Sequence, residues 1–459
     1  MRFRPRRPEP LGRAFTALWF GEGVSLLGSQ VTVLALPLIA ITSLGAGTIA
    51  VGALYACSFL PYLLVGLQAG AVVDRLDRRS VMIVCDVVSA AALLSVPLLW
   101  WAGVRSVGPL VAVAFLTGCC GIFFEVANTA RLPSLVRPDR LMVANARMET
   151  TRAAALVVGP GLGGLLVRAL GAPAAVTVDA VTFLVSGAAL LAVPAALPRA
   201  RSAPDGPAPD GPAPGGPAPG GPAPPGRAPA PSRPPLRRDI AEGLRFVRRH
   251  DLLRPTVASY AASVLFIGMY QAMVILFMVR SAGLRGAAIG LVLGLGNLGF
   301  VAGATLARRL GARIGVGWAI VASLGLIAAG FLVSSAATSW WAVPCLVAGQ
   351  FVSSLGTPVY NVTFISLRQT VTPPELLGRV TAVCRTLGRG LVPLGALAGA
   401  WIAATAGSRT VLVVAGLGGL AALVPVVFSA VPGVRTLDQV RPAAPSPPAG
   451  ARRPSSVPG

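Results

Sequence analysis

Four acidic residues stand inside long apolar stretches of the sequence, where an ionisable side chain costs roughly 2.5–3.5 kcal/mol to insert into a membrane. They are Glu22, Asp86, Glu125 and Asp179. A carboxyl group held away from water can exchange a proton near neutral pH, which is the chemistry of proton coupling. Glu22, in the segment WFGEGVSLLGSQ, is the strongest candidate for this role. The alternative is a carboxylate that only satisfies a packing contact between helices. Structural pairing is the expected role of Asp86 and Asp179.

A second group of polar side chains could form a gate or line a cavity. Glu125 shares one predicted helix face with Asn128 and Thr129 near the inner end of its apolar segment, which predicts a contact with an arginine of a cytoplasmic loop. Arg385 and Arg389 are four residues apart and so also share a face. Arg385 can reach the inner surface through its long side chain.

Arg389 lies deeper than Arg385, about 15 Å along a helix from Arg379. It is expected to contact an anionic cargo or to pair with an acid in the cavity. The alternative for Arg389 is a water-exposed structural residue. Gln30 is a candidate for the cavity lining, although such a residue often serves only as a contact between helices.

Catalytic and metal chemistry finds little support in the sequence. The six cysteines form no CxxC pair, and the only histidine, His250, stands among arginines. Small buried side chains are the expected role of these cysteines. We therefore expect no enzyme activity, no metal site and no cofactor.

The composition indicates a polytopic membrane protein. Of 459 residues, 54% are hydrophobic and 12% are charged, and the mean hydropathy is +0.73. A soluble domain has about 25% charged residues. The net charge of +23 comes from arginines in short clusters between apolar runs, with no lysine. This spacing is typical of cytoplasmic loops and not of a nucleic-acid groove, so the expected partner is the lipid bilayer.

The apolar runs predict an all-α membrane protein with twelve transmembrane helices, six on each side of a central break, because each run can cross about 30 Å of hydrocarbon. The runs are 14–41, 48–73, 81–102, 108–130, 153–170, 174–197, 256–279, 287–307, 314–336, 340–366, 380–405 and 409–431. Only 5 of the 39 basic residues fall on the side opposite to the termini, so both termini are expected to be cytoplasmic.

The break divides the chain into predicted domains. A six-helix bundle, 1–198, precedes a cytoplasmic linker, 199–254, and a second bundle, 255–433, precedes a disordered tail, 434–459. In the linker, 200–235 is a tether rich in Pro, Ala and Gly, with four related pentapeptides at 207–226. Residues 236–250 form an amphipathic helix with Leu236, Ile240, Leu244 and Val247 on one face. This helix is expected on the inner leaflet, and partner binding is the alternative.

The two halves carry related sequence features at nearly the same spacing. LPSLVRPDRL at 132–141 aligns with LRQTVTPPEL at 367–376 at an offset of 235, and Pro160 aligns with Pro393 at an offset of 233. Halves that repeat in this way predict two pseudo-symmetric six-helix bundles and alternating access to a site between them.

The loop GAVVDRLDRR at 70–79 resembles the G-x-x-x-D-R-x-G-R-R loop of the major facilitator superfamily, with Asp77 where the family usually has Gly. The resemblance implies a cytoplasmic lock between Asp74 and the eleventh helix, here near Gly378 and Arg379. In the second half, Ala307 replaces the acid, so the lock is expected on one side only. The gate residues so identified are Gly70, Asp74, Arg75, Arg78 and Arg79.

The segment GPGLGG at 159–164 resembles an element that marks exporters of this superfamily. Its small residues and its proline allow a bend and a close approach of helices. Segments 123–164, 178–186 and 376–399 are similar to the branch of enterobactin exporters and macrolide efflux proteins. The motif residues are Gly159, Pro160, Gly163 and Gly164.

This resemblance implies a monomeric secondary transporter in the bacterial inner membrane. It would export a small amphipathic molecule, such as a drug, a macrolide-like natural product or a siderophore, by proton antiport. Glu22 would face the cavity, because the first helix lines it in this superfamily. The fourth helix lacks the buried arginine of many proton-coupled exporters, since 108–124 carries no charge. An importer of the same fold and a non-transporting scaffold or sensor are the alternatives.

Overall fold

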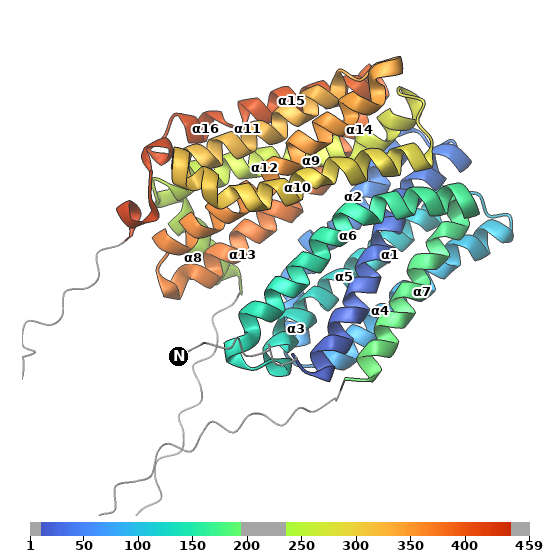
Figure 1. The fold of residues 1–459 in the computed structure, drawn as a ribbon, viewed down its shortest axis with the longest axis horizontal. Coiled ribbons are helices and arrows are strands. Elements are labelled where there is room, and N and C mark those ends of the chain that lie inside the picture. Colours follow the sequence, from blue (N-terminus) through green and yellow to red (C-terminus); the bar gives the residue numbers. More distant parts are fainter. Residues whose placement is uncertain (1–10, 194–235, 442–459) are drawn as a thin grey trace, which may run out of the picture.

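The computed structural model describes residues 11–193 and 236–441. The predicted tether, 200–235, and the end of the predicted tail, 442–459, lie outside the described residues. Figure 1 shows two bundles side by side, one from each half of the chain. Within the described ranges the protein is helical and has no strands, in agreement with the predicted all-α fold.

The first bundle contains the helices that precede the break. They are α1 (Arg13–Leu38), which continues as a π-helical turn (Ile39–Ser43), α2 (Thr48–Leu64), α3 (Gly66–Val73), α4 (Arg78–Trp101), α5 (Val107–Leu135), α6 (Leu141–Leu170) and α7 (Ala172–Leu191).

The second bundle contains the helices that follow the break. They are α8 (Leu236–Arg249), α9 (Leu253–Arg280), α10 (Gly286–Ile314), α11 (Val316–Ser335), α12 (Ala342–Val371), α13 (Pro374–Gly390), α14 (Val392–Ala406), α15 (Ser408–Ala421) and α16 (Val424–Val427).

These helices are consistent with the predicted twelve membrane crossings. In the described part of the chain, eleven helical segments are long and apolar enough to span a bilayer. The shorter apolar helix α2 fills the remaining predicted position, and α3 continues it after a break at Val65. Helices α13 and α14 form one crossing, Pro374–Ala406.

Some helices extend beyond the apolar runs that predicted them. The predicted fifth crossing begins at residue 153, whereas α6 begins at Leu141. The added turns include Arg147, Glu149 and Arg152, so the hydrogen-bonded helix continues past the hydrocarbon into a polar region. An apolar run therefore marks the membrane-embedded part of a helix and not its ends.

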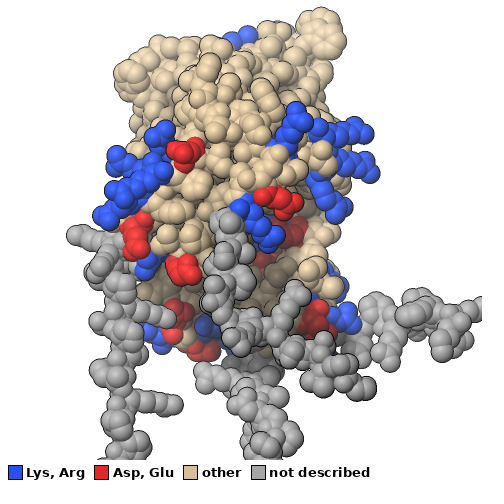
Figure 2. All heavy atoms as spheres, turned by 90° about the vertical axis from the view of Figure 1, so that its left-hand side faces the viewer, with Lys and Arg blue, Asp and Glu red and all other residues tan. Residues whose placement is uncertain are grey.

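We call the end of the two bundles that carries residues 74–79, 137–140 and 308–313 the arginine-rich end. Figure 2 looks onto this end, where basic and acidic side chains gather around its face. Figure 1 places α3, α8, α13 and the start of α1 at this end. The arginine-bearing loops of both halves therefore lie at one end of the molecule, as the arginine pattern predicts.

Contacts between the two bundles concentrate toward the opposite end. There, α6 packs along α10 and α2 packs along α14. A side chain at Gly164 would come within 2.6 Å of the Gly286 carbonyl oxygen, and Gly52 packs on Ala400. Arg280 donates a hydrogen bond across the bundles to the Ala46 carbonyl, 2.7 Å away. The molecule is therefore closed at the end opposite to the arginines.

The amphipathic helix α8 packs against α13 and α9. Val247 is buried, whereas Leu244 on the predicted apolar face is 41% exposed. Glu242 pairs with Arg379 of α13 at 2.7 Å, and Gly243 lies against the backbone of the same residue. One side of α8 thus contacts the second bundle, which leaves Leu244 available to lipid.

The C-terminal end of the second bundle extends past the predicted boundary at 433. The backbone N–H groups of Val316 and Gly317 donate to the carbonyls of Arg435 and Val434. Thr436 then caps a short helical turn, Leu437–Val440. The expectation of a disordered segment from residue 434 is wrong for 434–441, because these backbone hydrogen bonds tie it to the start of α11.

Candidate functional site

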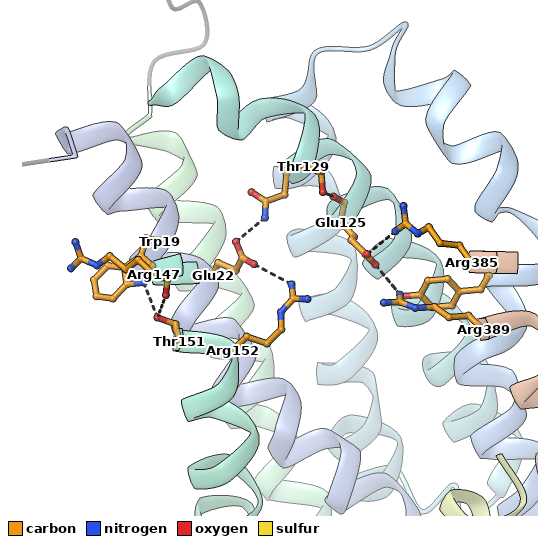
Figure 3. Close-up of polar contacts among 11 residues, drawn as sticks. Trp19, Glu22, Glu125, Thr129, Arg147, Thr151, Arg152, Arg385 and Arg389 are labelled. Carbon is orange, nitrogen blue, oxygen red and sulfur yellow. Dashed lines mark hydrogen bonds and ion pairs between the residues drawn. The ribbon is translucent and has the colours of Figure 1, made fainter. Parts of the chain in front are cut away.

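Glu22 lies on α1 at the junction with α5 and α6, and it is 8% exposed. The Asn128 side-chain amide on α5 donates to its carboxylate at 2.8 Å. The Arg152 guanidinium on α6 lies 3.9 Å from the other carboxylate oxygen. Figure 3 shows the Arg152 side chain pointing toward Glu22. The structure thus joins two residues that the sequence singled out separately, Glu22 and Asn128.

A contact next to this site fixes α1 against α6. The Trp19 indole N–H donates to the Thr151 hydroxyl at 2.8 Å. The Arg147 guanidinium lies 3.8 Å from the centre of the Trp19 ring, in a cation–π contact. Because Thr151 directly precedes Arg152, this contact helps to hold the guanidinium near Glu22 (Figure 3).

Glu125 on α5 connects the two bundles. Its two carboxylate oxygens each accept a hydrogen bond at 2.9 Å, one from Arg385 and one from Arg389, both on α13. The Tyr62 hydroxyl on α2 lies 3.4 Å from the same carboxylate, and Arg389 lies over the Tyr62 ring. Glu125 was expected to meet an arginine of a loop, but both partners come from a helix of the other half (Figure 3).

The predicted lock residue Asp74 does not contact α13 in this conformation. Its side chain is 61% exposed, and Arg78 lies 3.9 Å from it. Arg379, the expected partner, instead pairs with Glu242 of α8. A side chain at Gly70 would meet open space, so no neighbouring helix packs closely on this gate residue in the described conformation.

The gate arginines are placed differently from one another. Arg78 donates to the Ala130 carbonyl of α5, and Arg79 donates to the carbonyls of Leu190 and Leu191 at the end of α7. They therefore tie the start of α4 to two neighbouring helices of the same bundle. Arg75 is exposed. Arg78 and Arg79 thus brace the first bundle internally and do not serve as a lock to the second.

Asp77, the departure from the family loop, caps α4. It accepts hydrogen bonds from the Ser80 backbone N–H at 2.9 Å and from the Ser80 hydroxyl at 2.7 Å. The hydrogen bond from the Ser80 hydroxyl is the main cause that lowers the pKa of Asp77 below its usual value. The ionised carboxylate is therefore the form of Asp77 that caps the helix best.

We expect Asp77→Ala to lower the free energy of unfolding by about 1 kcal/mol, as loss of an N-cap typically does. The pKa of Asp77 is lower in the folded protein than in the unfolded chain, where it is about 4. The ionised carboxylate therefore stabilises the protein fully above about pH 4, and this stabilisation disappears as the pH falls through the pKa of the folded state. Thermal unfolding in detergent between pH 7 and pH 3 measures the effect. Asp77→Asn should keep the cap at neutral pH and lose the pH dependence. An unchanged profile in both variants would contradict the cap.

The exporter motif lies where α6 meets α1 on one side and α10 on the other. Gly159 packs on the side chain of Gln30, and Gly163 packs on the backbone of Val31. The Pro160 carbonyl and Gly164 lie against Gly290 of α10. Gln30, a candidate for the cavity lining, is therefore in contact with a helix at this position. The motif forms part of the seam that closes the opposite end.

The arrangement of two helical halves is that of known solved transporters. A bacterial homologue of the iron transporter ferroportin, solved in an inward-facing state, superposes with a TM-score of 0.66 at 17% identity and covers 91% of this chain and 99% of its own. A POT family transporter superposes with a TM-score of 0.69 at 9% identity and covers 91% of this chain and 96% of its own. At these identities the likeness shows the fold alone.

The model of the Major Facilitator Superfamily matches residues 18–284 and 256–457. The chain belongs to the major facilitator superfamily. As a member of this superfamily it is a multi-pass membrane transporter and not an enzyme. Among residues 11–193 and 236–441, no group of three or more His, Cys, Asp or Glu side chains could hold a metal ion.

Curated relatives place the chain near efflux proteins of this superfamily. The multidrug efflux pump Tap of Mycobacterium tuberculosis is 28% identical over 403 residues, which cover 84% of this chain and 86% of the pump. Macrolide efflux protein A of Streptococcus pyogenes is 25% identical over 185 residues, 40% of this chain and 44% of that protein. These similarities support the efflux-like branch that the motifs predict.

Several residues of this major facilitator site were not predicted from the sequence. Arg152 stands just before the apolar run that marked its helix, so its place beside Glu22 could be found only from the longer α6. Tyr62 gave no signal, because one tyrosine in an apolar run has no distinctive spacing. Trp19 was visible only as part of the segment around Glu22.

The seam provides a direct test of how this transporter closes. In Gly164→Ala the new methyl group would approach the Gly286 carbonyl oxygen to 2.6 Å, a backbone atom that cannot move aside. Overpacking of this kind costs about 1–3 kcal/mol, so we expect the closed seam to open more often. The labelling rate of Val167→Cys in a cysteine-free background measures this opening, because Val167 contacts Gly286 in the seam.

Gly161→Ala is the matched control, since a methyl group there meets open space on the same helix. It should leave the labelling rate unchanged. Equal labelling of both variants, at equal expression, would show that the seam does not control access.

Proposed function

We propose that this major facilitator protein exports a small amphipathic molecule across the bacterial inner membrane by alternating access, coupled to proton antiport. The functions of its relatives, multidrug and macrolide efflux, support export. The arginine-rich end, which carries the start of α1, would be cytoplasmic. With that orientation, the closed seam at the opposite end makes the conformation inward-facing.

One observation carries the coupling proposal. Glu22 accepts a hydrogen bond from Asn128, and Asn128 lies three residues from Glu125 on α5. Residues three apart on a helix share a face, so α5 contacts a buried acid of its own bundle and two arginines of the other bundle. A change in the charge of Glu22 would therefore act on the helix that connects the two halves.

The transport cycle follows from these contacts. Cargo bound from the inner side would open the seam between α6 and α10, and Asp74 could then reach α13 and close the arginine-rich end. Facing outward, Glu22 would take up a proton as the cargo leaves, which removes the charge that faces Arg152 and weakens the acceptor of Asn128. The protonated carrier would return to the inner side, and release of the proton there would restore the present contacts, including the pair of Glu125 with α13.

The unit of transport is proposed to be a monomer, with the bundles of domains 1–198 and 255–433 as its two halves. One chain supplies both sides of the Glu125 contact and both sides of the seam. Segment 200–235 would act as a spacer between the halves, since its repeated pentapeptides contain no apolar anchor.

An export screen tests the proposal. The protein is expressed in a bacterial strain that lacks its own efflux pumps, and cellular levels of a panel of anionic, neutral and cationic amphipathic compounds are measured by mass spectrometry. Export predicts lower accumulation of at least one class, reversed by collapse of the proton gradient. Increased accumulation would indicate an importer, and unchanged levels of every class at normal expression would contradict transport of such molecules.

A further inference from the structure

Arg368 near the end of α12 is a buried cation that differs from the other arginines of the site. It is 8% exposed. Arg379, Arg385 and Arg389 each have an ion pair with a glutamate, but among the described residues no carboxylate lies within 4 Å of Arg368. Its Nε–H has no hydrogen-bond partner. A buried charge without a counter-ion is costly, so a protein retains one for a reason.

The residues around Arg368 form a stripe on α12. Tyr360, Phe364, Arg368 and Thr372 follow one another at intervals of four, which places them on one face. The guanidinium lies 5.6 Å from the centre of the Phe364 ring. It also lies beside the Cys384 thiol of α13.

An aromatic stack continues this stripe. The Tyr360 and Phe364 rings stack with centres 5.2 Å apart, and Tyr260 of α9 stacks on Tyr360 at 5.1 Å. Arg368 is close enough to act electrostatically on both tyrosines. Gly388 of α13 leaves room for the Tyr260 hydroxyl. The cation therefore lies at one end of a stack of aromatic rings.

The polar atoms that lack partners share one chemistry. On this stripe they are the Arg368 Nε–H, the Tyr360 hydroxyl, which is 3% exposed, and the Thr372 hydroxyl, which is 5% exposed. All three can donate hydrogen bonds, and the guanidinium can only donate. Donors around an unpaired positive charge favour a ligand with several acceptor oxygens and a negative charge.

We propose that Arg368, with Tyr360 and Thr372, binds the anionic group of an organic acid, and that the aromatic stack contacts the planar body of the same molecule. The proposal rests on the proposed transport function, because it names the cargo class: an amphipathic molecule that carries a carboxylate or a similar anion. The anionic cargo supplies the counter-ion that Arg368 lacks, so the buried guanidinium selects anionic over neutral molecules.

The test measures binding and does not require transport. The purified full-length protein in nanodiscs of phosphatidylcholine is titrated with 1-naphthoate and with 1-naphthamide, which differ in charge but share one ring system. We expect naphthoate to bind and naphthamide to bind at least tenfold more weakly, which corresponds to one charge-assisted hydrogen bond. Arg368→Gln should weaken naphthoate binding about 10- to 100-fold, and Arg368→Lys should restore part of it.

Arg308→Gln removes an exposed arginine at the same end of the molecule and is the matched control. It should leave naphthoate binding unchanged. Equal affinity of the two ligands, or equal loss of binding in the Arg308 and Arg368 variants, would overturn the proposal. Displacement of naphthoate by phosphatidylglycerol in the nanodisc would also overturn it, by assigning the site to a lipid headgroup.

A stability measurement separates a binding role from a structural one. If Arg368 serves a ligand, Arg368→Met should raise the thermal midpoint of the ligand-free protein, since the variant removes an unpaired buried charge. A lowered midpoint would assign Arg368 to packing and contradict the proposal. Failure of all export in the cellular screen, with naphthoate binding intact, would instead contradict the transport function alone.

Discussion

Glu22→Gln is expected to fold normally and to lose the dependence of export on the pH gradient. The glutamine amide has nearly the size of the carboxyl group, and its oxygen can still accept the hydrogen bond from Asn128. It cannot take up or release a proton. Export driven by a pH gradient in proteoliposomes should therefore fall to the rate seen without a gradient, while cargo binding remains.

Two variants make the Glu22 experiment specific. Glu22→Asp should retain partial function, because it still titrates although its carboxyl group is one methylene farther from Asn128 and Arg152. Glu375→Gln makes the same chemical change at an exposed position at the start of α13 and should behave as the unmodified protein. Full gradient-driven export by Glu22→Gln would assign Glu22 to a packing contact and leave Glu125 as the next candidate for the proton.

Glu125→Gln is expected to shift the protein away from the conformation described here. The substitution removes the negative charge that holds Arg385 and Arg389, and it leaves two guanidinium groups without their counter-ion. These side chains are partly exposed. We therefore expect the free-energy difference between the closed-seam and open-seam conformations to change by about 1–2 kcal/mol, which is a factor of about 5–30 in their population ratio. Labelling of Val167→Cys in the seam should rise by that factor.

The Glu125 contact also predicts how paired substitutions combine. Arg389 acts through Glu125. The double variant Glu125→Gln with Arg389→Gln should therefore change the free-energy difference between the two conformations by less than the sum of the changes in the two single variants. Asp139→Asn, which changes an exposed acid near the same end, should leave labelling unchanged. Fully additive effects, or no change in labelling for Glu125→Gln, would show that this contact does not hold the two bundles.

The fold could be predicted from the sequence because membrane crossings leave long apolar runs, and because each run must satisfy its own backbone hydrogen bonds as a helix. The ends of the helices could not. α6 starts twelve residues before its apolar run, where arginines and a glutamate continue the helix outside the hydrocarbon. The start of the predicted tail was misplaced because 434–441 is held by backbone hydrogen bonds to α11, and backbone pairing leaves little trace in composition.

For the site, the sequence identified single residues better than pairs. Glu22, Glu125, Asn128 and Arg389 stood out because polar side chains are rare in apolar segments. Their partners depend on how each helix is rotated about its axis and on how the two bundles meet, which spacing along one helix does not determine. Glu125 therefore meets α13, and not the predicted loop.

The state of the gate could not be predicted for a related reason. The loop motif predicts that Asp74 can reach α13, but a transporter makes that contact only in some of its conformations. Here Arg379 pairs with Glu242 of α8, a helix whose amphipathic pattern predicted a membrane surface. A sequence describes all the states of a carrier at once, whereas the structure describes one of them.

Proton movement coupled to cargo flux tests the central claim most directly. Proteoliposomes that contain the protein and a pH-sensitive dye, with no imposed pH gradient, receive an outward gradient of a compound identified in the export screen. Antiport predicts that the pH inside falls as cargo leaves, and that Glu22→Gln abolishes this change. Cargo flux through the unmodified protein with no change in internal pH would contradict proton antiport.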